Sequence, residues 1–185
     1  MPSPVFEKGR AVMTWPPVHA VAVVGTVLAA AVSDVMSRRI PNALTLGAAA
    51  VAIGMHGVLS GWSGVVFAVS GWAVGLALFF PLFALKGMGA GDVKLLAAIG
   101  AWLGPLGAVW TALYGAVAGG VMAVAVALAR RYVGTAVRNL GTLLRSWRIA
   151  GVRPVEGLTL GSASGPRLPY ALPLAAGAIL TLWVR

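Results

Sequence analysis

The stretch VVFAVSGWAVGLALFFPLFAL, residues 65–85, decides the fold class of this chain. It contains no charged residue, and it is long enough to cross the roughly 30 Å hydrocarbon core of a bilayer as an α-helix. It also lacks the alternation of apolar and polar side chains that a strand of a membrane β-barrel requires. The stretch therefore predicts a transmembrane helix.

Further apolar stretches on both sides of this one predict an all-α, polytopic membrane protein with about six transmembrane helices. The composition agrees, because 59% of the 185 residues are apolar and only 10% are charged, whereas about a quarter of the residues in soluble domains are charged. The other predicted spans are Val18–Ser33, Ala43–Leu59, Val93–Leu103, Leu106–Ala129 and Leu168–Val184. The turns between them fall at Ser60–Gly64 and at Gly104-Pro105, among others. We expect a single membrane-embedded domain over residues 1–185.

The basic residues predict how these spans are oriented. The chain holds 14 Lys and Arg residues against 4 Asp and Glu, a net charge of +10, and basic residues concentrate in cytoplasmic loops. If the loop after the first span is cytoplasmic, both termini lie outside. The basic residues on the inner side are then Arg38, Arg39, Lys86, Lys94, Arg130, Arg131, Arg138, Arg145, Arg148, Arg153 and Arg167. The charge therefore records topology, and we expect a multi-pass protein of the cytoplasmic membrane that binds no nucleic acid.

Residues 130–167 form a basic segment that we expect on the cytoplasmic side. Within it, apolar residues recur every three or four positions over Val133–Trp147 and cover one side of a helix, with Arg131, Arg138 and Arg145 on the opposite side. This pattern predicts an amphipathic helix that lies on the anionic inner leaflet, although a cytoplasmic extension of the preceding span fits it equally well. The Gly-, Ser- and Pro-rich remainder of the segment predicts a loop.

Carboxylates are scarce in this chain, and two of them adjoin the ends of predicted spans. Asp34 opens the run DVMSRRIPN, residues 34–42, and Asp92 lies in the run KGMGAGDVK, residues 86–94. The predicted topology places both at the same membrane face, where ionisable groups are costly and mark functional sites. Two carboxyls brought close share a proton. One can then activate water while the other donates to a carbonyl oxygen, which is hydrolysis without a metal or a covalent intermediate.

Each aspartate also has a structural interpretation when it is taken alone. Asp34 can form an i,i+4 ion pair with Arg38 at a helix end, and Asp92 can cap the N-terminus of the helix that follows it. In the first run, Pro41 ends one helix and Asn42 can cap the next. The glycines of the second run allow the close backbone approach that an extended substrate peptide needs.

The order of these two runs resembles the type IV prepilin peptidase family, which are membrane aspartic proteases of the Gly-x-Gly-Asp type. The segment LPYALPLAAG, residues 168–177, is similar to the Pro-Tyr stretch in the last helix of that family. The resemblance implies that Asp34 and Asp92 are the catalytic pair. The residues that support the motifs or the substrate are then Gly89, Gly91, Lys86, Lys94, Arg38, Pro41, Asn42, Pro169 and Tyr170.

The resemblance also implies a substrate, a prepilin whose short basic leader is cut off at the cytoplasmic face. Larger members of the family N-methylate the new terminus as well and carry a cysteine-bearing cytoplasmic segment. This chain has no Cys, and only residues 35–42 separate Asp34 from the next span. These departures favour the short, peptidase-only branch, similar to the enzymes of Flp or tight-adherence pili. Where larger members have Gly after Pro-Tyr, this chain has Ala171. We expect no cofactor and no metal.

Other functions stay open at this stage. The chain is also compatible with a Gly-x-Gly-Asp protease that acts on preflagellin or on signal peptides. A non-catalytic assembly or transport subunit would use the aspartates as a proton or cation site. We expect no catalytic or metal role for His19 and His56, which the topology places near the outer face. Gly-xxx-Gly pairs at residues 57–61, 71–75 and 115–119 favour packing within the molecule before assembly of a homo-oligomer.

Overall fold

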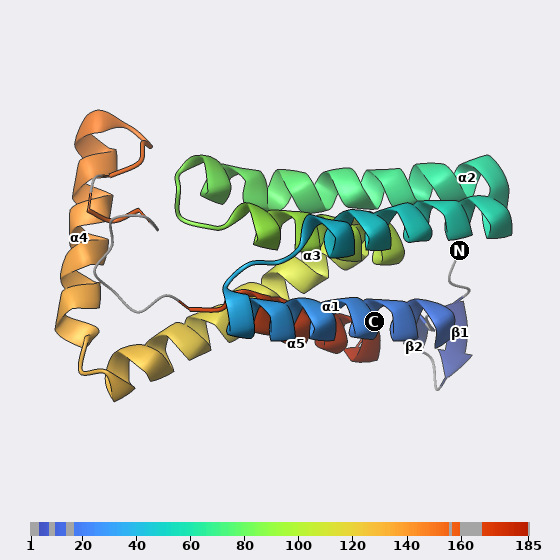
Figure 1. Cartoon of the computed structure of the whole chain (residues 1–185), viewed down its shortest axis with the longest axis horizontal. Helices are drawn as coiled ribbons and strands as arrows, with labels where there is room; N and C mark the ends of the chain where they lie inside the picture. The colour runs from blue at the N-terminus through green and yellow to red at the C-terminus, as the bar shows by residue number, and fades with distance from the viewer. Residues whose placement is uncertain (1–3, 8–9, 14–16, 156, 160–167, 185) are drawn as a thin grey trace.

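The computed structural model describes residues 4–7, 10–13, 17–155, 157–159 and 168–184. In this part of the chain the structure is largely helical (Figure 1). A short antiparallel hairpin precedes the helices and adds two strands, β1 (Pro4–Glu7) and β2 (Arg10–Met13), to the predicted all-α class. The helices are α1 (Pro17–Ser37), α2 (Asn42–Ala84), α3 (Ala90–Ala129), α4 (Val133–Ala150) and α5 (Ala171–Val184).

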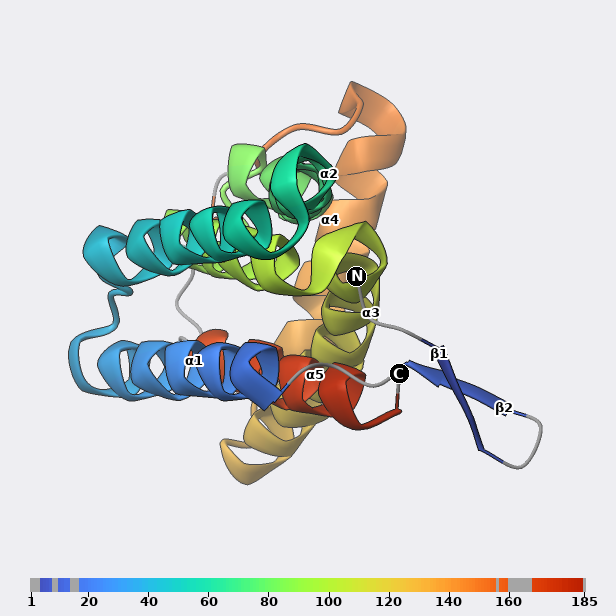
Figure 2. The ribbon, with the colours of Figure 1, turned by 90° about the vertical axis from the view of Figure 1, so that its right-hand side faces the viewer.

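Two of the helices, α2 and α3, are each interrupted at a glycine. Gly61 (φ 60°) interrupts α2, and Gly104 (φ 72°) interrupts α3 just before Pro105. Positive φ is open to glycine and costly for most other residues, and a Cβ atom at Gly104 would also collide with the Phe67 ring. At these points α2 folds back on itself and α3 reverses its direction, as Figures 1 and 2 show. Both breaks lie where the sequence predicts turns between spans.

The lengths of the helices agree with a multi-pass membrane protein. Three of them, α1, α2 and α3, are long and apolar enough to cross a membrane, and α5 is a shorter apolar helix. When α2 and α3 are each divided at their glycine, the segments follow the predicted spans in order. The crossing of the bilayer by every segment, and the location of both termini outside, stay predictions.

The last two helices differ slightly from expectation. α4 covers the predicted amphipathic segment and ends three residues beyond Trp147. α5 begins at Ala171, later than the predicted Leu168, because Pro169 and Tyr170 form the turn that leads into it: the Leu172 N–H donates to the Pro169 carbonyl oxygen at 3.3 Å. Most of the predicted loop that joins α4 to α5 lies outside the described residues.

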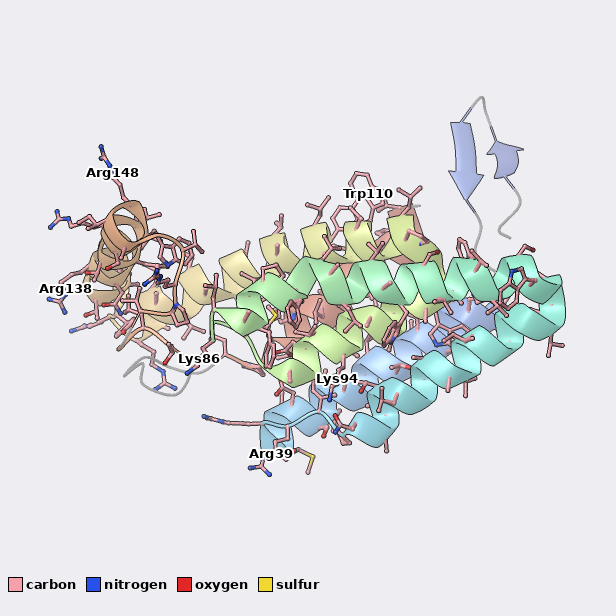
Figure 3. The ribbon with its side chains drawn as sticks, turned by 90° about the horizontal axis from the view of Figure 1, so that it is seen from above. Arg39, Lys86, Lys94, Trp110, Arg138 and Arg148 are labelled. Atoms are coloured by element: carbon pink, nitrogen blue, oxygen red, sulfur yellow. The ribbon has the colours of Figure 1, made fainter. Side chains whose placement is uncertain are left out.

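Three basic residues end the long helices at the same end of the bundle. Arg38 follows α1, Lys86 lies just after α2 and Arg131 just after α3. Among the described residues, these are the non-glycine residues with positive φ, between 53° and 56°. Such a left-handed residue is typical of a helix C-terminus, where a positive charge also interacts favourably with the helix dipole. The labelled Arg and Lys side chains in Figure 3 lie toward this end.

Small residues let the helices of the bundle approach closely. Gly71 of α2 lies against the backbone of Gly100 in α3, so that a Cβ atom at Gly71 would collide with it. A Cβ atom at Gly177 of α5 would lie 2.6 Å from the backbone nitrogen of Gly115 in α3. In lipid, such close packing is a main source of helix association. The pairs at 71–75 and 115–119 therefore serve packing within the molecule, as predicted, whereas a Cβ atom at Gly61 of the pair at 57–61 would meet nothing within 4 Å.

The two histidines meet near the beginning of α1, whereas Asp34 lies in the last turn of that helix. The ring centroids of His19 and His56 are 4.9 Å apart, and both side chains are buried. His56 Nε2 lies 3.2 Å from the carbonyl oxygen of Trp102. Because α3 is interrupted at Gly104, the carbonyl groups just before it lack their usual N–H donors within the helix. His56 thus has a structural role, at the end of the molecule where the predicted topology places it.

Candidate active site

Asp34 is half-buried in the last turn of α1, and its carboxylate points toward α5. Oδ2 accepts a hydrogen bond of 3.2 Å from the backbone N–H of Ala171, the first residue of α5. The first N–H groups of a helix have no partner inside the helix, so Asp34 satisfies one of them across 137 positions of sequence. Arg38, the predicted ion-pair partner, contacts Asp34 through the backbone, because its N–H donates to the Asp34 carbonyl oxygen at 2.9 Å.

Asp92 is the third residue of α3, and its half-buried carboxylate lies at the tip of that helix. The prediction that Asp92 caps α3 is wrong, because Gly89 already has the extended backbone (φ −76°, ψ 147°) from which the helix starts. The carboxylate instead interacts with the backbone of Gly89. An acidic group at this position of a helix commonly reaches back to the cap residue in this way.

The structure brings the two aspartates together. They are close enough for their charges to interact, although the whole of α2 separates them in sequence. Two consecutive residues, Tyr170 just before α5 and Ala171 at its start, each interact with one of the two aspartates. Ala171 donates to Asp34, and burial together with the Asp92 charge raises the pKa of the Tyr170 phenol. The tips of α1, α3 and α5 therefore meet at one place.

Two glycines of the second motif, Gly89 and Gly91, leave the space that lets these helix tips approach each other. A Cβ atom at Gly89 would lie 3.1 Å from Oδ2 of Asp92, so the absence of a side chain leaves room for the carboxylate. A Cβ atom at Gly91 would lie 3.1 Å from the Cβ atom of Ile40, in the loop between α1 and α2. Gly89 thus accommodates the acid, and Gly91 lets α3 approach the loop that follows Asp34.

Ser33 and Ser37 fix the other side of this loop to α1. The Ser33 hydroxyl donates to the carbonyl oxygen of Arg39 at 2.8 Å, and the Ser37 hydroxyl lies 3.2 Å from the same oxygen. Neither serine belongs to the residues that the sequence motifs indicate. A signal was present, because Ser33 directly precedes Asp34 and a serine near a helix end commonly bonds to nearby backbone.

The first residues of α2 attach to α3. The cap of α2 is Pro41, so the predicted capping role of Asn42 is wrong. Asn42 is already helical, and its Oδ1 accepts a hydrogen bond of 2.9 Å from Nζ of Lys94 in α3. This bond joins the two predicted motifs directly. Four of the predicted supporting residues, Gly91 and Lys94 in one motif and Pro41 and Asn42 in the other, are therefore in or beside the contact between them.

Tyr170 is held by packing from two directions. Its ring meets that of Phe79 edge to face, with centroids 6.0 Å apart. On its other side, a Cβ atom at Gly119 would lie 3.0 Å from the Tyr170 ring. Phe79 and Gly119 are contacts that no local sequence pattern indicates, because they come from the second halves of α2 and α3. Together with Pro169 before it, this packing fixes the turn that presents the Ala171 N–H to Asp34.

Exposed basic residues lie near the site. Arg38 and Lys86 are both exposed at the ends of α1 and α2, and Lys86 lies in the turn that joins α2 to α3. Among the described residues, there is no group of three or more His, Cys, Asp or Glu side chains that could hold a metal ion. The chemistry that the arrangement offers is that of two carboxyls that exchange protons with a bound molecule.

The comparison with known families agrees with this site. Residues 21–124, more than half of the chain, match the sequence profile of the type IV leader peptidase family. The match runs from α1 into the second half of α3, so it includes both aspartates and the three glycines of the second motif. No curated protein and no solved structure matches the chain.

Proposed function

The chain belongs to the type IV leader peptidase family, and from this premise we propose that it is an aspartic endopeptidase that removes leader peptides from prepilins. The family implies a peptidase. The observation that carries the aspartic mechanism is the meeting of Asp34 and Asp92 at the tips of two helices.

In the proposed reaction, the two carboxyls have complementary roles. The ionised carboxylate takes a proton from a water molecule, and the oxygen of that water attacks the carbonyl carbon of the scissile peptide bond. The protonated carboxyl donates its proton to the carbonyl oxygen. The tetrahedral intermediate then collapses, the C–N bond breaks, and the nitrogen leaves as an amine after taking up a proton. The carbonyl half leaves as a carboxylic acid, and no bond to the protein forms.

The position of the site supports a substrate that is cut where its leader meets an apolar helix. The carboxylates lie at the tips of apolar helices, where such a junction would reach the membrane surface. The basic residues gather at this end, and the positive-inside rule assigns it to the cytoplasm. We therefore infer a multi-pass enzyme of the cytoplasmic membrane that cuts prepilins from the cytoplasmic side. The missing Cys and the short first loop favour an enzyme of Flp or tight-adherence pili without methylation.

The test is cleavage of a full-length prepilin by the protein in membranes. Asp34→Asn and Asp92→Asn keep the shape of the side chain and remove the acid, so each should lower kcat by about 10²–10⁴-fold. Glu7→Gln removes a carboxyl elsewhere in the chain and should leave the rate unchanged. Full activity of either aspartate variant would contradict the two-carboxyl mechanism.

The same assay separates the alternatives. Cleavage of a preflagellin or a signal peptide, with no cleavage of the prepilin, would change the substrate and keep the mechanism. If no leader peptide is released and the aspartate variants abolish an ion flux instead, the protein is a transport subunit. Either result would overturn the assignment to prepilins.

A further inference from the structure

The helix α4 exposes an apolar stripe. It consists of Val133, Ala136, Val137, Leu140, Leu143, Leu144 and Trp147. Side chains of this stripe are half or more exposed, with relative exposures of 64% for Val137 and 56% for both Leu140 and Leu144. No residue of α4 is buried. The flank of the stripe near Trp147 is partly covered, since Trp147 Nε1 donates to the carbonyl oxygen of Arg153 at 2.9 Å. Ala136 and Leu143 are partly covered as well, so that Val137, Leu140 and Leu144 form the open part of the stripe.

The charges of α4 are all positive, and Arg138 and Arg145 lie opposite the stripe. Residues 130–155 contain no Asp or Glu, and Arg138, Arg145 and Arg148 are exposed. Figure 3 shows Arg138 and Arg148 pointing away from the helical bundle. On a helix with 3.6 residues per turn, the apolar stripe is turned to the other side from Arg138 and Arg145, toward the bundle end.

The orientation of α4 is set by the turn that precedes it. The N–H of Tyr132 donates to the carbonyl oxygen of Ala127 at 2.8 Å, and the N–H of Arg131 donates to that of Leu128 at 3.1 Å. This pair of bonds, with a left-handed residue at Arg131, is the pattern that ends a helix and redirects the chain. The side chain of Asn139 then bonds to the Tyr132 hydroxyl at 3.3 Å. As a result, α4 runs crosswise to α1 and α2 in both Figures 1 and 2.

A helix that lies crosswise at the end of membrane-spanning helices runs along the membrane surface. We propose that α4 lies in the headgroup region of an anionic lipid leaflet, with its apolar stripe toward the acyl chains and its arginines toward the headgroups and the cytoplasm. A second copy of the chain fits this face less well, because two helices without any acidic residue would bring like charges together. An anionic lipid surface supplies the negative charge that complements the arginines of α4.

This inference rests on the proposed membrane topology and is independent of the peptidase reaction. The absence of Cys allows a single fluorescent label. Leu140→Cys puts an environment-sensitive label on the stripe, and Thr142→Cys puts the matched control on the opposite side, where the residue is also exposed. The full-length protein is placed, one copy per disc, in nanodiscs of phosphatidylcholine with or without phosphatidylglycerol. A lipid-borne quencher reports insertion.

We expect the Leu140 label to be blue-shifted and quenched in discs with phosphatidylglycerol, and the Thr142 label to stay in water. Each basic residue near an anionic surface contributes to binding, so replacing Arg138, Arg145 and Arg148 together with Gln should lower the ratio of inserted to free α4 by roughly a hundredfold.

Three results would overturn the inference, the third from a second preparation with two copies per disc. A Leu140 label that stays in water in every disc would show that the stripe does not meet lipid, and equal quenching with and without phosphatidylglycerol would remove the role of charge. Shielding that occurs only in discs with two copies would assign the stripe to a second copy instead.

Discussion

Asp34 at the end of α1 accepts a hydrogen bond of 3.2 Å from the backbone N–H of Ala171 at the start of α5. The bond joins the first and the last helix of the bundle at the place where Asp92 of α3 also lies. It orients one carboxylate of the candidate site through a backbone group, so the residue that supplies the donor need not have a particular side chain. This relationship suggests how the site is held and how it can be tested.

Ala171→Pro should lower kcat while the helix remains intact. Proline has no N–H, so Asp34 loses its donor, yet proline is well tolerated at the first position of a helix. A hydrogen bond to a charged group is worth about 1.5–3 kcal/mol, and we expect a loss of roughly tenfold or more in kcat. Ala171→Gly keeps the N–H and should retain most of the activity. Equal loss in both variants would indicate that packing at Ala171, and not the hydrogen bond, is important. Prepilin cleavage and thermal unfolding of each variant measure the two effects separately.

Gly89→Ala should displace the Asp92 carboxylate with little effect on stability. The backbone of Gly89 (φ −76°, ψ 147°) suits any residue, so the change acts mainly through the new methyl group, 3.1 Å from Asp92 Oδ2. We expect kcat to fall by roughly tenfold, since small misplacements of a catalytic group are costly, and the free energy of unfolding to change by less than about 1 kcal/mol. In the matched control, Gly87→Ala, the nearest contact would be an ordinary 3.5 Å to a backbone oxygen. The interpretation fails if both variants cleave at the same rate.

Ser33→Ala should reduce activity by loosening the loop between α1 and α2. The variant loses the 2.8 Å bond to the Arg39 carbonyl oxygen, and Ser37 replaces it poorly, because its one hydroxyl proton has a closer acceptor in the Ser33 carbonyl oxygen at 2.7 Å. We expect a moderate fall in kcat, about three- to tenfold for a bond worth about 1 kcal/mol, with KM less affected. Ser33→Thr keeps the hydroxyl and should restore the rate. If threonine does not restore it, the hydroxyl of Ser33 has no positioning role.

Tyr170→Phe should make the protein less sensitive to alkaline pH. Burial and the Asp92 charge raise the pKa of Tyr170 in the folded state, so the folded protein holds this proton more tightly than the unfolded chain does. The corresponding stability is present below the ordinary tyrosine pKa of about 10 and is lost as the pH rises above it. Thermal unfolding of wild type and variant across this range measures the difference. Parallel curves for the two proteins would contradict the assignment, and Tyr114→Phe is a control, because Tyr114 lies on the surface-facing side of α3 beside Trp110.

Local patterns in the sequence were sufficient for most of the fold. The lack of charge in residues 65–85 and their neighbours indicated apolar helices, because a long uncharged run is stable only where water is absent. Glycine at positions 61 and 104 marked the points where α2 and α3 reverse, since positive φ is costly elsewhere. The three- and four-residue spacing of apolar side chains predicted α4.

Details of the helix ends were predicted less well. Asp92 and Asn42 were expected as helix caps, yet the caps are Gly89 and Pro41. Several residue types suit a cap position, and their neighbours in space determine which position the cap takes. The start of α5 at Ala171 was missed for the same reason.

The sequence by itself determined the kind of protein and the order of its helices, and it singled out two carboxylates as candidates, because each of these depends on residue types and short spacings. Only the tertiary structure decided that Asp34 meets the N–H of Ala171, that Gly91 receives Ile40, and that Lys94 bonds to Asn42. These contacts join residues far apart in the chain, and they form only when helices pack closely at their small residues. A local pattern reports which side of a helix is apolar, whereas packing between helices decides which tips come together.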